Sequence, residues 1–297
     1  NDIFLLLLQF RMNLIRRIIG MIDYKKPAEI ELIKQSAQLV SKTLGVIAEI
    51  IRPGITTLEL DKAAESFIRD HGAKPGFLHM YDYPNTLCTS VNEQVVHGIP
   101  NNKPLKEGDI VSVDCGVLMN GYYGDHAYTF AVGEISEENK RLMRVTYESL
   151  MSGISQVKQF NKIGDISYAI QKHCENNGYG VVRELVGHGL GRKLHEAPQV
   201  PNYGNKHRGP LMKNGIVLAI EPMINMGKPD VYTLSDKWTV VTKDKKNSAH
   251  YEHDVAVQGG KAVILSTFDY VEDVLKKKGE FYVSDESYIA HVPINYS

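Results

Sequence analysis

Cysteine is scarce in this chain, and an excess of charge of either sign is absent. The 297 residues include three cysteines, Cys88, Cys115 and Cys174, with no Cys-x-x-Cys pair. Their odd number and wide spacing exclude a disulfide framework and fit a reducing, cytoplasmic compartment. The formal net charge of −1 gives no electrostatic reason to expect nucleic acid or an acidic membrane as a partner.

Apolar runs long enough to cross a bilayer and low-complexity linkers are also missing. The first stretch, "NDIFLLLLQFRMNLIRRIIG", has too short an apolar run to span a membrane, and its arginines follow that run, unlike in a signal peptide. We predict that residues 1–20 are an extension outside the fold, with an amphipathic surface anchor as the alternative. Residues 281–297 lack a clear period and are predicted to form a tail. This leaves 21–280 as a single domain.

Within that domain, one order of elements occurs twice. Apolar residues at helical spacing, followed by a tight turn, a second helix, a glycine and strand-like segments, appear in both halves of the chain. The predicted N-caps include Thr57, Ser136 and Asp165. The sequence therefore predicts an α/β fold of two related halves with a site where they meet. The expected helices span residues 26–51, 57–72, 136–160 and 164–178.

A predicted hairpin, "VDCGVLMNGYYGDHAYTF", carries two aspartates on strands that look buried. If Asn120 and Gly121 form a two-residue type I′ turn, Gly116 pairs with Asp125. Asp114 then lies diagonally across from Asp125 on the same face, with Cα atoms roughly 7–8 Å apart. Two carboxylates at this spacing can converge on a small cation, and Gly116 leaves space between them. Taken alone, two solvent-facing aspartates are the simpler interpretation.

Three further polar residues lie within apolar or glycine-rich segments. Glu221 is embedded in "GIVLAIEPMI", Glu252 in "HYEHDVAV", and His188 in "VGHGLG". Buried glutamates are uncommon unless they are paired or ligated. The glycines around His188 match neither a dinucleotide nor a phosphate-binding loop.

Together these positions offer four carboxylates and one imidazole. Four negative charges balance two divalent cations, which bridging carboxylates hold roughly 3.5–4 Å apart with a shared hydroxide between them. The oxygen-rich set suits Mn, Fe(II), Co or catalytic Zn, and the sequence does not choose among them. The predicted metal ligands are Asp114, Asp125, His188, Glu221 and Glu252.

These motifs resemble those of the type I methionine aminopeptidases, in the pita-bread metallopeptidase superfamily. The resemblance runs from about Met21 to about Asp273 and rests on "SVNEQVVHGIP", "DIVSVDCGVLMNGYYGDHAYTF", "GHGLGRKLHEAPQVPNYG", "LAIEPM" and "YEHDVAV". It implies a dinuclear metal site in a pita-bread fold. In that site Asp114 chelates one ion, His188 and Glu221 bind chiefly the other, and Asp125 and Glu252 bridge both.

The resemblance also implies the chemistry. His97 and His195 are expected to contact substrate and act in catalysis, and Glu221 to relay the proton of a bridging water. The resulting hydroxide attacks the first peptide carbonyl. The implied function is removal of the initiator methionine from peptides and nascent chains, with the ribosome as an expected place of action, by a monomeric enzyme that prefers a small second residue. His195 and Glu221 are 26 positions apart, too close for the insertion of type II relatives.

The expected pocket for the methionine side chain is matched in part. Tyr83, Cys88 and the single tryptophan, Trp238, fall at its positions, although each is also compatible with ordinary core packing. Leu194 stands where many type I members have phenylalanine. Three further positions also differ from other members, namely Phe77, Met80 and Tyr81.

Two rival functions remain open. One is an aminopeptidase of the same fold that acts on proline-containing peptides. The other is a binding protein that has kept the fold without the chemistry, as in superfamily members that have lost ligands. The complete ligand set disfavours the second rival.

Overall fold

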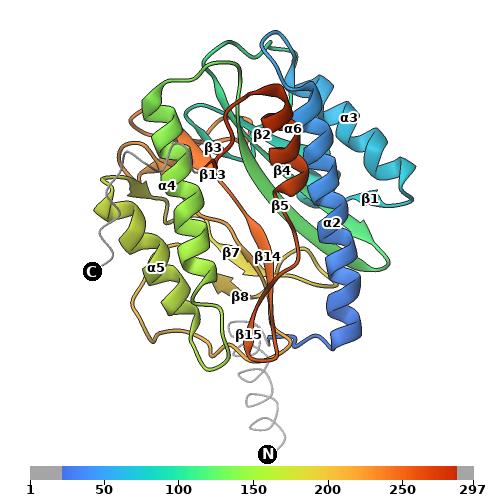
Figure 1. Ribbon diagram of the computed structural model, residues 1–297, viewed down its shortest axis with the longest axis vertical. Coiled ribbons are helices and arrows are strands. Elements are labelled where there is room, and N and C mark those ends of the chain that lie inside the picture. The colour runs from blue at the N-terminus through green and yellow to red at the C-terminus, as the bar shows by residue number, and fades with distance from the viewer. Residues whose placement is uncertain (1–21, 286–297) are drawn as a thin grey trace, which may run out of the picture.

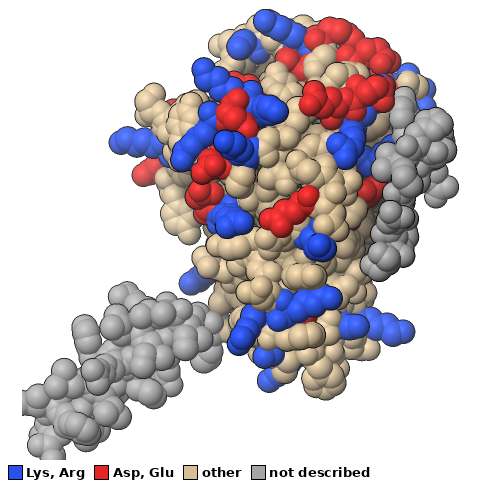
Figure 2. Space-filling model, turned by 90° about the vertical axis from the view of Figure 1, so that its left-hand side faces the viewer, with Lys and Arg blue, Asp and Glu red and all other residues tan. Residues whose placement is uncertain are grey.

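The computed structural model describes residues 22–285. The predicted extension, 1–20, and residues 286–297 of the predicted tail lie outside this range. Among the described residues, no helix combines the length and apolar character needed to cross a membrane. On the face that carries α4 and α5, basic and acidic side chains are interspersed (Figure 2), as the net charge of −1 leads one to expect.

The two predicted helix pairs flank a central group of sheets. Figure 1 shows α2 and α3 on one side and α4 and α5 on the other, with the strands between them. A last helix, α6, packs beside α2. The helices are α2 (Pro27–Ile50), α3 (Thr57–Asp70), α4 (Glu137–Ile154), α5 (Ile163–Asn176) and α6 (Asp269–Lys278), with a 3₁₀ turn, η1 (Met80–Asp82), before the first long strands.

The strands of the described residues form four small sheets. Two of them build the site: one in which β4 pairs with β1, β2 and β5, and one in the order β15-β14-β9-β7-β8. The others run β13-β10-β6 and β11-β12-β3. The bounds are β1 (Lys74–Pro75), β2 (Leu87–Val91), β3 (Gln94–Val96), β4 (Ile110–Met119), β5 (Tyr122–Ala131), β6 (Gly180–Val181), β7 (Gly187–Gly189), β8 (Glu196–Val200), β9 (Val217–Ile220), β10 (Met223–Asn225), β11 (Val231–Thr233), β12 (Val240–Thr242), β13 (Ser248–His250), β14 (His253–Gln258) and β15 (Lys261–Ile264).

Helix boundaries follow local hydrogen bonding, and three of them correct the predictions. Thr56, one residue before the predicted Thr57, caps α3 by accepting a hydrogen bond from the Glu59 amide at 3.2 Å. Asp165 is not the cap of α5. It lies inside the first turn, and its carboxylate accepts a hydrogen bond from the Lys162 amide at 2.8 Å. Ser136 caps α4 as predicted.

The third correction concerns the end of α4, which stops at Ile154 and not near residue 160. The amides that would continue the helix bind other segments. Gln159 donates to the Gly260 carbonyl and Phe160 to the Met212 carbonyl, each at 3.0 Å. Hydrogen bonds to segments far away in the sequence therefore end the helix before its apolar pattern ends.

The predicted hairpin is confirmed in register. Asn120 and Gly121 have φ of 53° and 79°, as a type I′ turn requires, and Gly116 pairs with Asp125. The space beside Gly116 is filled differently from the prediction. A Cβ there would lie 2.5 Å from Cε1 of Phe77, so the glycine admits an aromatic ring beside the two aspartates.

The hydrophobic core lies between the helix pairs and the sheets. The apolar stripe of α2 buries Ile33, Val40, Leu44 and Ile47 against the β4–β5 hairpin and α6. The core extends to Val283, which is also buried. This packing fixes the backbone of the hairpin and hence the place of its aspartates.

Candidate active site

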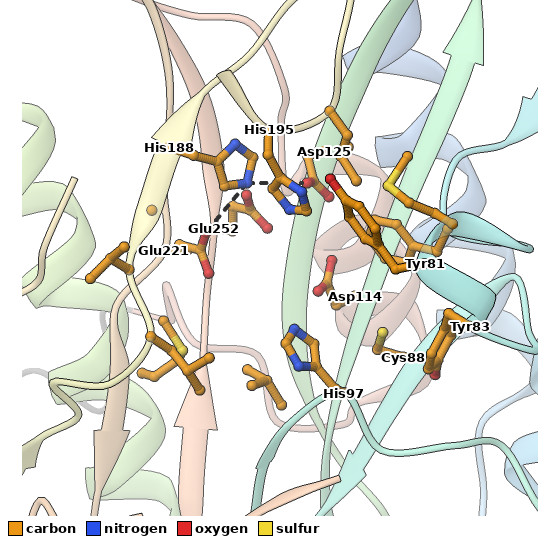
Figure 3. A pocket seen from close by; sticks show the side chains of 18 of the residues that line it. Tyr81, Tyr83, Cys88, His97, Asp114, Asp125, His188, His195, Glu221 and Glu252 are labelled. Atoms are coloured by element: carbon orange, nitrogen blue, oxygen red, sulfur yellow. Dashed lines mark ion pairs between the residues drawn. The ribbon is translucent and has the colours of Figure 1, made fainter. Parts of the chain in front are cut away.

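All ten residues predicted for the site line one cavity of about 480 Å³. The structure therefore brings together side chains that lie up to 169 positions apart, from Tyr83 to Glu252. In Figure 3 the carboxylates and the His188 ring point toward a common centre, with His97 and His195 on opposite sides of it. The ten are Tyr83, Cys88, His97, Asp114, Asp125, His188, His195, Glu221, Trp238 and Glu252.

Both halves of the fold supply the polar residues. Asp114 and Asp125 lie within β4 and β5, whereas His188 lies in the short strand β7. Glu221 directly follows β9 and Glu252 directly precedes β14. Because β9 and β14 are antiparallel with His253 opposite Ile220, the two glutamates leave the ladder at the same end and face each other across it.

Of the four carboxylate residues, Asp125 and Glu252 are buried and Asp114 and Glu221 are half-buried, and no lysine or arginine of the described residues pairs with them. Burial raises the pKa of Asp114 to about 7. Burial, reinforced by repulsion from neighbouring carboxylates, raises the pKa values of Asp125, Glu221 and Glu252 well above their ordinary values. No lysine or arginine lines this cavity in the described part of the chain. Ionising all four groups here therefore requires a cation from elsewhere.

The donor atoms fit a metal cation on direct structural grounds. One oxygen each of Asp114, Asp125 and Glu252 is buried without a hydrogen-bond partner. Ligand atoms of Asp125, His188 and Glu252 lie within 4.8 Å of one another. Nε2 of His188 is 3.7 Å from Asp125 Oδ2 and 3.5 Å from Glu221 Oε1. These separations suit atoms that share an ion rather than hydrogen bonds.

The tautomer of His188 follows from its neighbour. Nδ1 lies 3.0 Å from the Gly189 carbonyl, and a carbonyl can only accept, so Nδ1 carries the proton. Burial lowers the pKa of His188 to about 3. The ring is therefore neutral at physiological pH and turns the lone pair of Nε2 toward the carboxylate cluster, as a metal ligand does.

Two further histidines border the carboxylate cluster. The His195 ring packs edge-to-face on His188, with centroids 4.5 Å apart, and burial lowers the His195 pKa. His97 has its pKa lowered to about 4 by burial and by His195, and its φ of 58° is left-handed. Both rings are neutral near pH 7, so each keeps one N–H to donate.

One wall of the cavity is apolar. Tyr83 and Trp238 meet edge-to-face with centroids 5.0 Å apart. The Tyr83 hydroxyl, held by the carbonyls of Leu87 and Gly98 at 2.9 and 3.0 Å, joins this wall to the residue after His97. The wall belongs to a single hydrophobic cluster that contains Phe77, Met80, Tyr83, Cys88, Leu194 and Trp238.

Sequence reasoning missed two residues that support the site. Asp254 is fully buried and accepts a hydrogen bond from the Asp125 amide at 2.9 Å. The His250 ring is buried, with Nε2 3.7 Å from Glu221 Oε2. His250 directly precedes "YEHDVAV" and Asp254 lies within it, but their roles follow only from the contacts of Asp254 with β5 and of His250 with Glu221.

The sequence profile of metallopeptidase family M24 matches residues 31–259. The methionine aminopeptidase of Clostridium perfringens is 54% identical over 237 residues, which are 80% of this chain and 95% of that protein. Methionine aminopeptidase 1 of Bacillus subtilis is 48% identical over 237 residues, covering 80% of this chain and 96% of the relative.

Solved structures give the same result for the fold. Methionine aminopeptidase from Rickettsia prowazekii superposes with a TM-score of 0.82 at 40% identity, covering 83% of this chain and 100% of that one. A prolidase from Pyrococcus furiosus gives a TM-score of 0.68 at 23% identity, covering 84% of this chain and 67% of the prolidase. These superpositions confirm the pita-bread fold. At 23% identity, the similarity to the prolidase concerns the fold alone.

Proposed function

The chain belongs to metallopeptidase family M24, and we propose that it is a methionine aminopeptidase, which removes N-terminal methionine by metal-dependent hydrolysis. One observation carries the proposal: an uncompensated cluster of buried carboxylates and His188 shares a cavity with an apolar wall of side-chain size. The relatives that are 48% and 54% identical over nearly their whole length carry the same name.

The metal would be held by the cluster already described. His188 offers one nitrogen, and Asp114, Asp125, Glu221 and Glu252 offer oxygens, a set suited to a pair of divalent ions such as Co, Mn, Fe(II) or Zn. When bound, such ions acidify water and polarise a carbonyl group.

The chain's own groups would do the remaining work. His195 and His97 are neutral N–H donors on opposite sides of the centre. His195 would stabilise the oxyanion that forms at the scissile carbonyl, and His97 would donate a hydrogen bond to the peptide. Glu221, whose raised pKa favours holding a proton, would take a proton from the attacking water and pass it to the leaving amine.

The apolar wall would select the first residue of the substrate. A linear thioether can bend to contact Cys88, Tyr83 and Trp238, whereas a β-branched side chain is stiff at χ1. We extend the proposal to a preference for a small second residue, as the resemblance to type I methionine aminopeptidases implies.

The proposed substrates are peptides and nascent chains that begin with methionine, handled by a monomer in the cytoplasm. Support for the compartment comes from the cysteines Cys88, Cys115 and Cys174, all buried and unbridged. Sedimentation of the purified chain and its co-purification with ribosomes test the remaining two points.

The decisive experiment is peptide hydrolysis by protein stripped with a chelator and then reconstituted with Co, Mn, Fe(II) or Zn in turn. We expect no turnover without metal, and cleavage of Met-Ala and Met-Gly but little of Val-Ala, Met-Arg or Ala-Pro. Comparable kcat/KM for Ala-Pro would favour the proline-directed rival. Metal binding without hydrolysis of any of these peptides would favour a binding protein.

A further inference from the structure

The segment that carries His195 lies outside regular sheet pairing. Residues 190–195 connect β7 to β8, and the register between these strands shifts at Gly187/Gly189. The His195 ring contacts His188 at its edge and lies loosely stacked beside Tyr81, with centroids 6.3 Å apart. No side-chain hydrogen bond to the His195 ring is found within the described residues. The position of this imidazole therefore depends on what holds its backbone.

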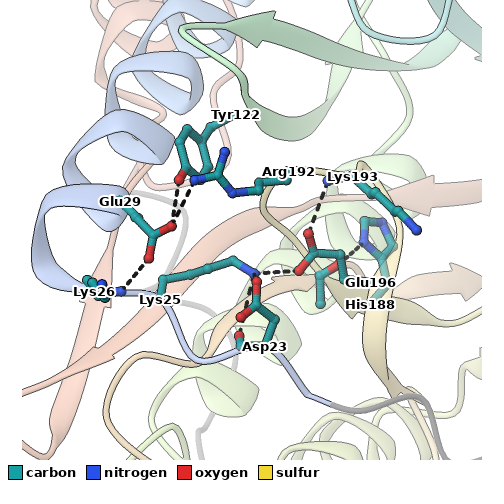
Figure 4. Close-up of polar contacts among 10 residues, drawn as sticks. Asp23, Lys25, Lys26, Glu29, Tyr122, His188, Arg192, Lys193 and Glu196 are labelled. Atoms are coloured by element: carbon teal, nitrogen blue, oxygen red, sulfur yellow. Dashed lines mark hydrogen bonds and ion pairs between the residues drawn. The ribbon is translucent and has the colours of Figure 1, made fainter. Parts of the chain in front are cut away.

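The backbone of residues 190–195 is held by Lys25, which lies in the segment just before α2. Its side chain is 1% exposed. Nζ donates to Glu196 Oε2 at 2.6 Å and to Asp23 Oδ2 at 2.5 Å. Glu196, the residue after His195, uses its other oxygen to accept a hydrogen bond from the Lys193 amide at 3.0 Å. Figure 4 shows Lys25 reaching between the two carboxylates.

The loop formed by residues 190–195 leaves room for the Lys25 side chain at Gly191. A Cβ at Gly191 would lie 2.2 Å from Lys25 Cε, so no other residue fits there without displacing the stem. The Lys25 amide donates to the Gly215 carbonyl at 2.7 Å, which anchors the lysine to the segment before β9. A buried ammonium group is energetically costly unless it is paired. The ion pairs of Lys25 with Glu196 and Asp23 are therefore part of the folded structure and differ from exposed surface ion pairs.

The opposite side of the same loop is held by the hairpin and α2. The Tyr123 amide donates to the Gly191 carbonyl at 2.8 Å. Arg192 donates to Glu29 Oε1 at 3.1 Å, and the Tyr122 hydroxyl donates to the same oxygen at 2.6 Å. Hydrogen bonds from the Tyr122 hydroxyl and the Lys26 amide, together with Arg192, lower the pKa of Glu29 to about 2, so the carboxylate is ionised at neutral pH.

We propose that Lys25 is a positioning residue for His195: through Glu196 it fixes the loop so that the imidazole faces the reacting carbonyl. This inference rests on the proposed catalytic role of His195. Lys25 contributes no atom to the cavity, and its effect on turnover must therefore pass through the loop. A displacement of about 1 Å at a catalytic group can cost up to about 10²-fold in rate.

The test is Lys25→Met, which keeps the stem and removes the ammonium. We expect kcat on a Met-Ala peptide to fall roughly 10-fold to 10²-fold, with KM changed less and the bound metal content unchanged. Lys278→Met is the matched control. Lys278 donates to the Ala48 carbonyl at 2.9 Å and lies away from the cavity, so its loss should lower the melting temperature and leave kcat unchanged.

A double-mutant cycle separates positioning from general stability. In the His195→Ala background, Lys25→Met should have almost no further effect on kcat, because the group that it positions is gone. Fully multiplicative effects would overturn the inference, as would a Lys25→Met protein with lower stability and unchanged kcat. If His195→Ala alone keeps full kcat, the proposed role of His195 fails instead, which is a distinct result.

Glu196→Gln provides a second route if Lys25→Met does not fold. The amide keeps the shape of Glu196 but weakens the bond from Lys25. We expect a smaller loss of kcat, again absent in the His195→Ala background. Failure of both variants to fold would assign Lys25 to the fold as a whole and overturn the inference.

Discussion

The two halves of the molecule hold their site residues in different ways. Asp114 and Asp125 lie in the middle of ten-residue strands, where a continuous ladder fixes the backbone on both sides. His188, Glu221 and Glu252 lie in or beside short strands of three to six residues. The long ladder holds the first pair, with one further hydrogen bond from the Asp125 amide to Asp254, whereas the second group depends on separate supports.

Those supports are single contacts between distant segments. The Asn202 side chain donates to the Glu221 carbonyl at 3.0 Å, and Asn202 is fully buried. By contrast, the Ser112–Thr129 hydrogen bond within the hairpin, at 2.9 Å, joins two residues whose relative position is already fixed by the backbone pairing of β4 with β5. The comparison teaches that side-chain supports matter for activity chiefly in the half with short strands.

The largest effect on turnover is expected from a substitution in the carboxylate cluster, to which both halves contribute residues. Asp125→Asn removes the charge that faces His188 and Glu252, so the proposed metal pair loses its charge balance. We expect metal content to fall and kcat to fall by more than about 10³-fold, beyond the cost of one lost hydrogen-bond donor. Metal content by mass spectrometry, measured beside kcat, checks this. Normal stoichiometry with normal turnover would remove Asp125 from the site.

His195→Ala should have the next largest effect. The cluster needs no ligand from His195, so we expect metal content and melting temperature to be nearly unchanged while kcat falls by about 10²–10³. KM should change less, because the lost interaction is stronger in the transition state. Loss of a metal ion in this variant would instead identify His195 as a ligand.

A pair of support variants tests the comparison of halves directly. Asn202→Ala should lower kcat/KM by about 10-fold to 10²-fold through Glu221, as loss of a ligand's hydrogen-bond partner typically does. Ser112→Ala should cost only about 1 kcal/mol of stability, with kcat/KM unchanged. Equal effects of the two substitutions on kcat/KM would contradict the distinction between the halves.

The smallest expected effect is a dependence of metal stabilisation on pH. In metal-free protein the raised carboxylate pKa values, about 7 for Asp114, mean that the folded state holds more protons than the unfolded state. The contribution of these groups to stability therefore falls as the pH rises above their unfolded values near 4.

Metal binding requires the same groups to be ionised. The rise in melting temperature on adding Mn²⁺ should therefore be larger at pH 7.5 than at pH 5.5. His188, with its pKa lowered to about 3, stays neutral at both values and does not contribute to the difference. An equal rise at both pH values would show that the cluster is already ionised without metal. Differential scanning fluorimetry with and without a chelator makes the measurement.

The sequence alone determined the elements with strong local signals. The Asn120–Gly121 turn has few alternatives, so the hairpin register and the shared face of Asp114 and Asp125 followed from spacing. The helix pairs followed from apolar periodicity. The resemblance supplied the expected roles of the histidines and of the wall residues, and the structure places all of these side chains around one cavity.

Only the tertiary structure decided the rest, because those features depend on contacts between distant segments. Phe77 fills the space beside Gly116. The amides of Gln159 and Phe160 bind other segments instead of extending α4, and Asp254, from another sheet, accepts a hydrogen bond from the Asp125 amide. Lys25 and Glu196 are 171 positions apart, and neither shows a local pattern. A buried ion pair of this kind is specified by the packing around it, which a single sequence read along its length does not display.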